Sequence, residues 1–448
     1  MNTRRSVFTA SLPAALGLAA CGATGNAPPP ADTGPATIKL TTTWTSGTRA
    51  TVMKELIDQF QQTNPRLKVE QQVVTPAPGS NYADAVLIQL TTASAADVIQ
   101  GDPQTIVQWQ ESGAPFADLT ARVKTDRVQL DDFFGPRGVA WERTGKIHGL
   151  PFQQSSGTTY GYCVTQFEQL NLTLPNKYAG KPGGWWDWSD FLAVLQRIKR
   201  DTDRDGTPDV WGAYVRNNYQ AWWGRFVESN GGAALNPQRT KTTLESAQAI
   251  EGFEFIADLV RRHQVALWED TLPAFRDAVG DPFGKGVIGV SQSVDLPGAI
   301  SMLERGQAKW SLAHIPTAPK TGKSIPAINN EPQMVYGQSK VVDAAFQWIK
   351  FGASKDVQLR LANTSGVGVI PSLKSVAKGD SWMGQYPELK KVVIESSEKA
   401  VALPFHGKYQ RWQTAIQTAA AKAFRGEVSA REAMLEATRE GDKVLAGQ

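Results

Sequence analysis

The chain of 448 residues has only two cysteines and four histidines, and it has no lysine- or arginine-rich block. Cys21 and Cys163 are too few for a disulfide framework. The four isolated histidines lack the spacing of zinc ligands. The missing basic block argues against nucleic acid as a partner. After the first 20 residues, no segment is long and apolar enough to cross a bilayer.

The chain also lacks the short motifs of several enzyme classes, namely a nucleophile elbow, a phosphate loop and a zinc-binding helix. A polysaccharide-acting enzyme stays open as an alternative, because a glycosidase needs only two carboxylates facing each other across a cleft. Cys163 lies in the apolar run Tyr160–Val164, which favours burial over nucleophilic catalysis. A binder of a non-sugar solute, such as a polyamine or a metal complex, is a third alternative.

The first residues indicate export. Arg4 and Arg5 precede an apolar run from Val7 to Ala20, which has the layout of a secretory signal and is too short to span a membrane. The small residues before Cys21 favour a lipoprotein signal, in which Cys21 is acylated, over an ordinary secretory signal. Thr3-Arg4-Arg5-Ser6 leaves both the general and the twin-arginine export routes open.

Residues 1–20 are therefore predicted to be a signal peptide and residues 21–37 a lipidated cysteine with a flexible tether. The tether is rich in Pro, Gly, Ala and Thr, which cannot bury enough apolar surface to fold. We expect an extracytoplasmic protein anchored by lipid, in the periplasm or on the outer face of the cytoplasmic membrane. The formal net charge of +4 falls to +2 when Arg4 and Arg5 leave with the signal.

Tryptophan is abundant, with 14 copies in a chain that is 41% hydrophobic and 20% charged. This composition supports a sizeable core, which we expect to form two lobes. Several tryptophans cluster, at 185–188 and at 222–223. Flat indole faces match the apolar C–H faces of sugar rings, although any single Trp is more often a core residue. The clusters therefore point to a sugar as one candidate solute.

Strands and helices alternate in the first hundred residues. The pattern predicts strands at 38–40, 67–74 and 97–99, with helices at 53–60 and 83–93 between them. Such alternation favours an α/β fold with a mostly parallel sheet, whose ligands lie beyond the carboxyl ends of the strands. Further helices are predicted at 189–199, 244–263, 344–352, 409–424 and 430–445.

An aspartate-rich loop follows the helix predicted at 189–199. Its carboxylates are Asp201, Asp203, Asp205 and Asp209, and alternate spacing allows oxygens to converge on one hard cation. Position twelve of an EF-hand loop would be Gly212, so the usual bidentate glutamate is missing. A structural Ca²⁺ held by these four residues and a solvated turn without metal are both left open. We expect no other cofactor.

The order of several motifs resembles the family 1 extracellular solute-binding proteins, the maltose-binding-protein-like receptors of ABC importers. The resemblance covers nearly the whole chain after the tether. The motifs that carry it are, in chain order, Glu55–Phe60, Asn64-Pro65, Leu67–Val69, Gly145–Pro151, Trp186–Phe191, Asn230–Gly232, Phe283–Val290 and Phe424–Ser429.

The resemblance implies a two-lobed periplasmic-binding-protein-like fold of type II, with hinge crossings between the lobes and the ligand in the cleft. It implies one lobe from residues 38–152 plus 292–330 and the other from residues 153–291 plus 331–448. It further implies a monomer that is not an enzyme. Such a receptor binds a mono- or oligosaccharide and delivers it to the permease subunits of an ABC importer.

The ligand contacts that we nominate combine aromatic faces with amide and charged groups that can bond sugar hydroxyls. They are Trp44, Asn81, Asp102, Tyr160, Trp222, Trp223, Asn330, Glu331, Arg411 and Trp412.

Overall fold

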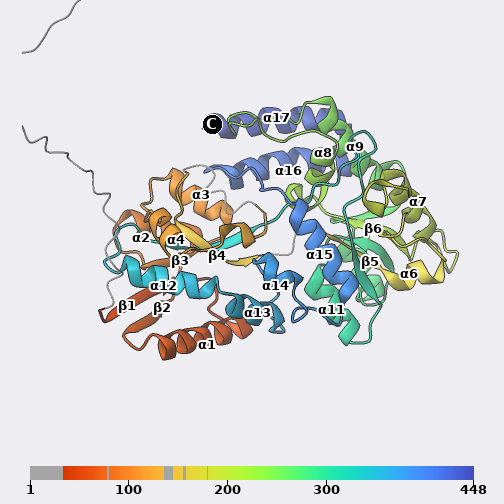
Figure 1. Cartoon of the computed structure of the whole chain (residues 1–448). Helices are drawn as coiled ribbons and strands as arrows, with labels where there is room; N and C mark the ends of the chain where they lie inside the picture. Colours follow the sequence, from red (N-terminus) through yellow and green to blue (C-terminus); the bar gives the residue numbers. More distant parts are fainter. Residues whose placement is uncertain (1–33, 78–79, 136–144, 155–157, 179, 448) are drawn as a thin grey trace, which may run out of the picture.

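The computed structural model describes residues 34–77, 80–135, 145–154, 158–178 and 180–447. These residues form two lobes, each built on a five-stranded sheet (Figure 1). The expected two-lobed α/β fold is thereby confirmed. The predicted signal peptide and Cys21 lie outside the described residues. Within the described ranges, every helix is too short or too polar to cross a bilayer.

Lobe 1 is built on the sheet β2-β1-β3-β10-β4. Its strands are β1 (Ala36–Thr41), β2 (Leu67–Gln72), β3 (Val98–Gln100), β4 (Gly149–Gln154) and β10 (Asn330–Val335). Its helices are α1 (Gly47–Thr63), α2 (Tyr82–Thr91), α3 (Pro103–Glu111), α4 (Thr120–Thr125), the 3-10 turn η1 (Leu130–Asp132), α12 (Val342–Gly352) and α13 (Lys355–Asn363). Helix α14 (Lys374–Lys378) follows, on the way to lobe 2.

Lobe 2 is built on the sheet β7-β6-β8-β5-β9. Its strands are β5 (Tyr160–Cys163), β6 (Trp211–Val215), β7 (Ala266–Trp268), β8 (Ile288–Ser291) and β9 (Trp310–Ala313). Its helices are α6 (Val164–Gln169), the 3-10 turn η2 (Pro182–Gly184), α7 (Trp188–Ile198), the π-helical turn η3 (Tyr219–Trp223), α8 (Gly224–Ser229), α9 (Ala247–Arg261), α10 (Leu272–Val279), α11 (Leu296–Glu304), α15 (Pro387–Lys399), α16 (Tyr409–Arg425) and α17 (Ala430–Ala446).

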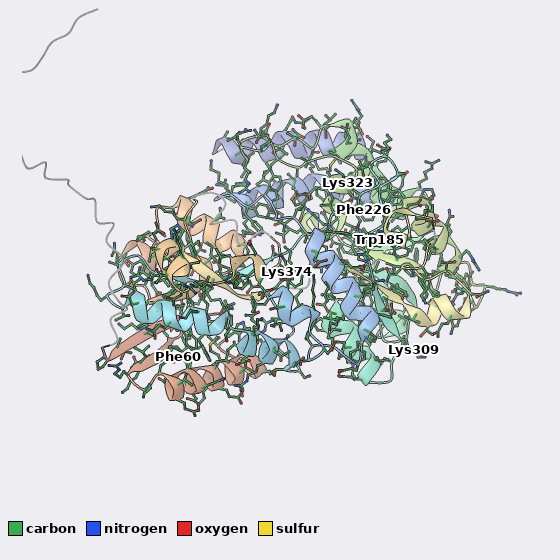
Figure 2. The ribbon with its side chains drawn as sticks, in the orientation of Figure 1. Phe60, Trp185, Phe226, Lys309, Lys323 and Lys374 are labelled. Atoms are coloured by element: carbon green, nitrogen blue, oxygen red, sulfur yellow. The ribbon has the colours of Figure 1, made fainter. Side chains whose placement is uncertain are left out.

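Helix periodicity explains how these elements bury their apolar faces. In α1, Val52, Met53, Leu56, Ile57 and Phe60 form one buried face. Each lobe has its own apolar core, and Figure 2 shows Phe60 in lobe 1 and Phe226 in lobe 2. The helices predicted from periodicity in the second half of the chain are confirmed as α7, α9, α12, α16 and α17.

The expected lobe boundaries are wrong for two segments. Strand β9 lies in lobe 2, because Cys163 of β5 pairs with Trp310, so residues 292–313 do not join lobe 1. Strand β10 lies in lobe 1, because it pairs with β3 and β4, and α12 and α13 pack on the same core. Residues 330–363 are therefore part of lobe 1, and only the later helices from α15 onward return to lobe 2.

Candidate functional site

The carboxyl ends of the parallel strands in both sheets meet where the chain crosses between the lobes. In lobe 1, β1, β3 and β4 end at this edge, and β10 begins there, with Glu331 opposite Gln153. In lobe 2, β8 ends beside the start of β5, with Gly161 opposite Ser291. We call this region the inter-lobe junction. Ligands of α/β sheets bind at this edge, so the junction is the candidate site.

Two chain segments join the lobes at the junction. The first crossing leads from Gln154 at the end of β4 to Tyr160 at the start of β5. The second crossing leads from Ala313 at the end of β9 to Asn330 at the start of β10. Asn330 and Glu331 lie where the second crossing enters β10. A third passage runs from α13 through α14 to α15.

The lobe-1 side of the junction carries a buried carboxylate, Glu331. The side-chain amide of Gln153 donates a hydrogen bond to it. Burial raises the pKa of Glu331, and the nearby charge of Asp102 raises it further, while Arg49 opposes the shift. The Arg49 guanidinium donates two hydrogen bonds to the Val367 carbonyl, at 3.0 and 2.8 Å. The Glu331 carboxylate therefore accepts a hydrogen bond from a neutral amide rather than from a cation. A carboxylate with such a partner suits a site that binds hydroxyl groups.

Two of the nominated lobe-1 residues have local structural roles. Asn81 caps α2, where its side chain accepts from the Asp84 backbone N–H at 3.0 Å. Asp102 caps α3, where its carboxylate accepts from the backbone N–H and the hydroxyl of Thr105. Asp102 is also exposed at the end of β3, and its charge acts on Glu331, so it stays a candidate ligand contact. Asn81 is explained by its cap alone.

Trp44 follows β1 at the same edge and is fully buried. Its ring packs edge-on against Phe152, with 5.3 Å between centroids, and the Arg49 guanidinium lies 5.4 Å from the indole centroid. Its Nε1 has no hydrogen-bond partner among the described residues. Trp44 is thus both a core residue of lobe 1 and a donor at the junction.

The lobe-2 side carries a closely packed, tilted aromatic pair. Tyr160 and Trp222 have ring centroids 4.4 Å apart at an interplanar angle of 33°. Both are buried, and burial raises the pKa of Tyr160 well above its usual value. Trp222 belongs to η3, a π-helical turn of a kind that often marks functional sites. Asn218 caps this turn by accepting from the Ala221 backbone N–H at 2.8 Å.

Trp223 and Trp412 are core residues, contrary to their nomination as ligand contacts. The Trp223 indole donates to Asn217 at 3.1 Å, and its ring packs edge-on against Phe253. The Trp412 indole donates to Thr242 at 3.0 Å. Unlike Trp222, both rings have their indole nitrogen paired within lobe 2. Apolar burial in lobe 2 explains both residues without a ligand.

The other two nominated residues lie at the margin of the junction. Asn330 is buried, and its side-chain amide donates to the Phe134 carbonyl at 2.8 Å. Arg411 is exposed in the first turn of α16. Beside it, Gln410 accepts a hydrogen bond of 2.8 Å from Gln104 of α3, which joins the two lobes directly. Arg411 is therefore placed near a contact between the lobes.

Buried polar atoms that lack a hydrogen-bond partner among the described residues occur in several places, and several of them lie at the junction. In lobe 1 and lobe 2 together they are Thr41 Oγ1, Trp44 Nε1, Gln153 Oε1, Gln154 Oε1, Tyr160 OH and Trp222 Nε1. Buried polar groups are normally satisfied, so such a concentration marks a place where a polar ligand or ordered water binds. Gln153 and Gln154 were missed from the sequence, where they read only as polar residues after a buried strand.

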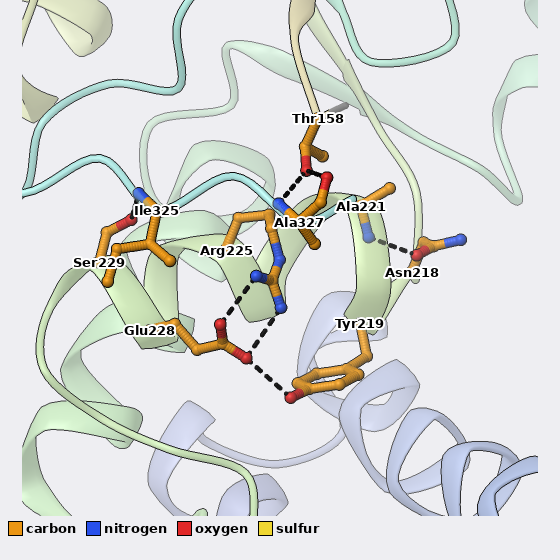
Figure 3. Close-up of polar contacts among 9 residues, drawn as sticks. All are labelled: Thr158, Asn218, Tyr219, Ala221, Arg225, Glu228, Ser229, Ile325 and Ala327. Atoms are coloured by element: carbon orange, nitrogen blue, oxygen red, sulfur yellow. Dashed lines mark hydrogen bonds and ion pairs between the residues drawn. The ribbon is translucent and has the colours of Figure 1, made fainter. Parts of the chain in front are cut away.

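An ion pair within α8, directly after η3, joins Arg225 to Glu228 (Figure 3). Arg225 of α8 is fully buried, and its two terminal nitrogens donate to Glu228 at 2.7 and 2.8 Å. The Tyr219 hydroxyl donates to the same carboxylate at 3.0 Å. The pair thus ties η3 to α8, next to Trp222.

The aspartate-rich loop lies apart from the junction, between α7 and β6. Carboxyl oxygens of Asp201, Asp203 and Asp209 lie within 4.8 Å of one another, and Asp205 is not part of this group. Asp201 accepts from the backbone N–H groups of Arg204 and Gly206, at 2.7 and 2.9 Å. The Thr202 hydroxyl donates to Asp209 and lowers its pKa. These bonds hold the loop together and leave carboxylate lone pairs for a hard cation.

Calcium binding by this loop stays a prediction. Added Ca²⁺ is expected to raise the melting temperature, because a ligand at a hundred times its Kd stabilises the folded state by about 2.7 kcal/mol. Chelator should reverse the effect. Differential scanning calorimetry of the native chain and of Asp209→Asn would measure it. An unchanged melting temperature in the native chain, or an equal shift in the variant, would rule the site out.

Comparisons with known proteins identify the fold and the family. A family profile described as bacterial extracellular solute-binding protein matches residues 55–391. The cyclic α-maltosyl-1,6-maltose binding protein from Arthrobacter globiformis superposes with a TM-score of 0.74 at 20% identity, over 93% of this chain and 100% of that one.

Two further solved structures are similar. An ABC substrate-binding protein from Listeria monocytogenes in complex with cycloalternan has a TM-score of 0.71 at 19% identity, over 92% of this chain and 99% of that one. Maltose-bound MalE3 of T. maritima has a TM-score of 0.67 at 19% identity, over 90% of this chain and 98% of that one. At these identities the likeness shows the fold.

Proposed function

We propose that this chain, which belongs to the bacterial extracellular solute-binding protein family, binds a carbohydrate at its inter-lobe junction. As a member of that family it is the solute receptor of an ABC transporter and not an enzyme, so the polysaccharide-acting alternative is set aside. The proposal concerns the identity of the solute and the residues that bind it.

The observation that carries the proposal is the closely packed pair Tyr160–Trp222 beside unsatisfied polar atoms from both lobes. A sugar ring has apolar faces that suit an aromatic side chain and hydroxyl groups that both donate and accept. Glu331, Gln153 and Gln154 supply acceptors from lobe 1, and the Trp222 indole supplies a donor from lobe 2. This combination matches a neutral, hydroxyl-rich solute.

The solved neighbours support the same class of solute. Those proteins bind cyclic α-maltosyl-1,6-maltose, cycloalternan and maltose, respectively. Asp102 is the only acidic group among the described residues that acts on the pKa of Glu331, whereas a polyamine would require several acids in an aromatic box. A sugar therefore fits the described side chains better than a polycation does.

The test is a thermal-shift panel on the protein without its signal peptide. The panel contains maltose, maltotriose, cycloalternan and cyclic α-maltosyl-1,6-maltose, with spermidine as the non-sugar comparison. A solute that binds only the folded state raises the melting temperature by mass action. We expect at least one sugar to raise it and spermidine to leave it unchanged. A shift with spermidine alone would replace the sugar by a polyamine.

We further propose that Cys21 anchors the receptor to the membrane through lipid, although this residue lies outside the described part of the chain. The support is the run of small residues before Cys21 and the tether after it. Cys21→Ala should move the protein from the membrane fraction to the soluble extracytoplasmic fraction. Fractionation and lipid labelling would measure this, and a variant that stays with the membrane would contradict it.

A further inference from the structure

The two crossings are joined to each other at one buried point. Thr158 of the first crossing donates from its backbone N–H to the Ala327 carbonyl at 3.1 Å. Its hydroxyl also donates to that carbonyl, at 2.9 Å, and accepts from the Ala327 N–H at 2.6 Å. One hydroxyl therefore satisfies both backbone groups of a residue 169 positions away. The crossings cannot separate at this point without leaving buried polar groups unpaired.

The second crossing is also tied to helix α8 of lobe 2. The Ser229 hydroxyl accepts from the Ile325 backbone N–H at 2.9 Å, and the Ser229 carbonyl accepts from the Thr321 hydroxyl at 2.5 Å. Ser229 is the last residue of α8 and is fully buried. The chain from Thr321 to Ala327 is thus held to lobe 2 at one end and to the first crossing at the other (Figure 3).

Helix α8 connects the contacts of the two crossings into one closed ring. It begins directly after η3, whose Trp222 packs against Tyr160, and Tyr160 lies two residues after Thr158. Starting from Thr158, the contacts lead through the aromatic pair, along α8 to Ser229, and back through the second crossing. We call this set the hinge network, and its members are Thr158, Tyr160, Trp222, Ser229, Ile325 and Ala327.

We propose that Thr158 and Ser229 are positioning residues for solute binding, because the hinge network fixes the aromatic pair relative to both crossings. The proposal rests on the proposed function, since it requires the Tyr160–Trp222 pair to contact the solute. Neither hydroxyl touches the solute; each holds a backbone segment that sets where the two rings lie. The crossings and the aromatic pair then move as one body with lobe 2.

The binding test uses the isosteric variant Thr158→Val, which removes the hydroxyl and keeps the shape. We expect it to weaken the binding of maltotriose about tenfold in calorimetric titration, which corresponds to the loss of about 1.4 kcal/mol. Thr158→Ser keeps the hydroxyl and should bind nearly as the native chain does. Ser229→Ala should weaken binding in the same direction as Thr158→Val.

A matched control separates positioning from general stability. Thr438 of α17 is also buried, and its hydroxyl donates to Met434 and Glu245, far along the chain from the hinge network. Thr438→Val is expected to lower the melting temperature and to leave the affinity unchanged. If Thr158→Val behaves like Thr438→Val, or if Thr158→Ser fails to restore binding, the positioning role is overturned.

Coupling to the aromatic pair gives a second readout. If Thr158 acts through Trp222, the affinity loss of Thr158→Val should largely vanish in the Trp222→Ala background, so the two losses do not add. Additive losses would mean that Thr158 acts by another route, and they would overturn the proposal.

Hydrogen exchange tests the hinge network without any solute. A failure of the network can therefore be distinguished from a failure of the proposed function. The Ala327 amide bonds to Thr158 and not to Ser229. In a connected network, Ser229→Ala should nevertheless lower the protection of the Ala327 amide together with that of Ile325. Unchanged protection at Ala327 in that variant would contradict the network, whether or not a sugar binds.

Discussion

Replacing Glu228 by alanine is expected to lower the free energy of unfolding by about 3–5 kcal/mol, because it leaves Arg225 buried without a counter-charge. Arg225 is fully buried. Glu228 accepts hydrogen bonds from both terminal nitrogens of Arg225 and from the Tyr219 hydroxyl. Arg225 has no exposed surface, whereas Glu228 is partly exposed, so the arginine is the group that would be left buried without a partner. Urea denaturation followed by tryptophan fluorescence would measure the change.

Two further variants test whether this loss of stability comes from the unpaired charge of Arg225. The double variant Arg225→Met with Glu228→Ala should be less destabilised than Glu228→Ala alone, because no charge is then left unpaired. Asp58→Ala removes an exposed ion pair with Lys54 and should change stability by less than about 0.5 kcal/mol. A Glu228→Ala loss as small as that of Asp58→Ala would show that Arg225 finds another partner or water.

Trp222→Ala is expected to weaken sugar binding about thirtyfold, which is about 2 kcal/mol and typical of a well-packed binding aromatic. The reason is that Trp222 packs against Tyr160 at the junction and has an indole nitrogen without a partner among the described residues. Calorimetric titration with the sugar that gives the largest thermal shift would measure the loss, with the melting temperature recorded beside it.

Trp223 is the matched control, because it is the next residue and equally buried. Its indole nitrogen is bonded to Asn217 and its ring packs in the lobe-2 core. Trp223→Ala should therefore cost about 3–5 kcal/mol of stability and leave the affinity of the folded protein nearly unchanged. Equal affinities for the native chain and Trp222→Ala would remove Trp222 from the site.

The helices of the second half could be predicted because each carries a local periodic signal. The apolar spacing of residues 409–424 and 430–445 defines α16 and α17, and Ser429 with Glu432 forms the capping box of α17. Such features depend on neighbours a few positions away. They are therefore readable from one sequence.

The lobe assignment of β9 and β10 could not be read in this way. Each is a short strand, and its partner lies about 150 to 230 residues earlier, at Cys163 for β9 and at Gln100 for β10. Pairing over such distances leaves no local trace in the pattern. The expected boundary at residue 330 therefore assigned β9 and most of β10 to the wrong lobes.

The candidate site shows the same limit at the level of single residues. Trp222 and Trp223 are adjacent and chemically identical, and only the π-helical turn decides which ring packs against Tyr160 and which packs against Phe253. Arg225 was missed because a lone arginine after two tryptophans carries no motif. Its role depends on Glu228 and on complete burial, which the fold creates.

The central claim is that a carbohydrate binds between the carboxyl edges of the two sheets. A crystal structure of the protein with the tightest-binding sugar of the panel tests it most directly. The account predicts a sugar ring against Tyr160 and Trp222, with hydroxyl groups bonded to Glu331 and Gln153. A sugar bound elsewhere on the surface, with Tyr160 and Trp222 still packed only against protein, would contradict it.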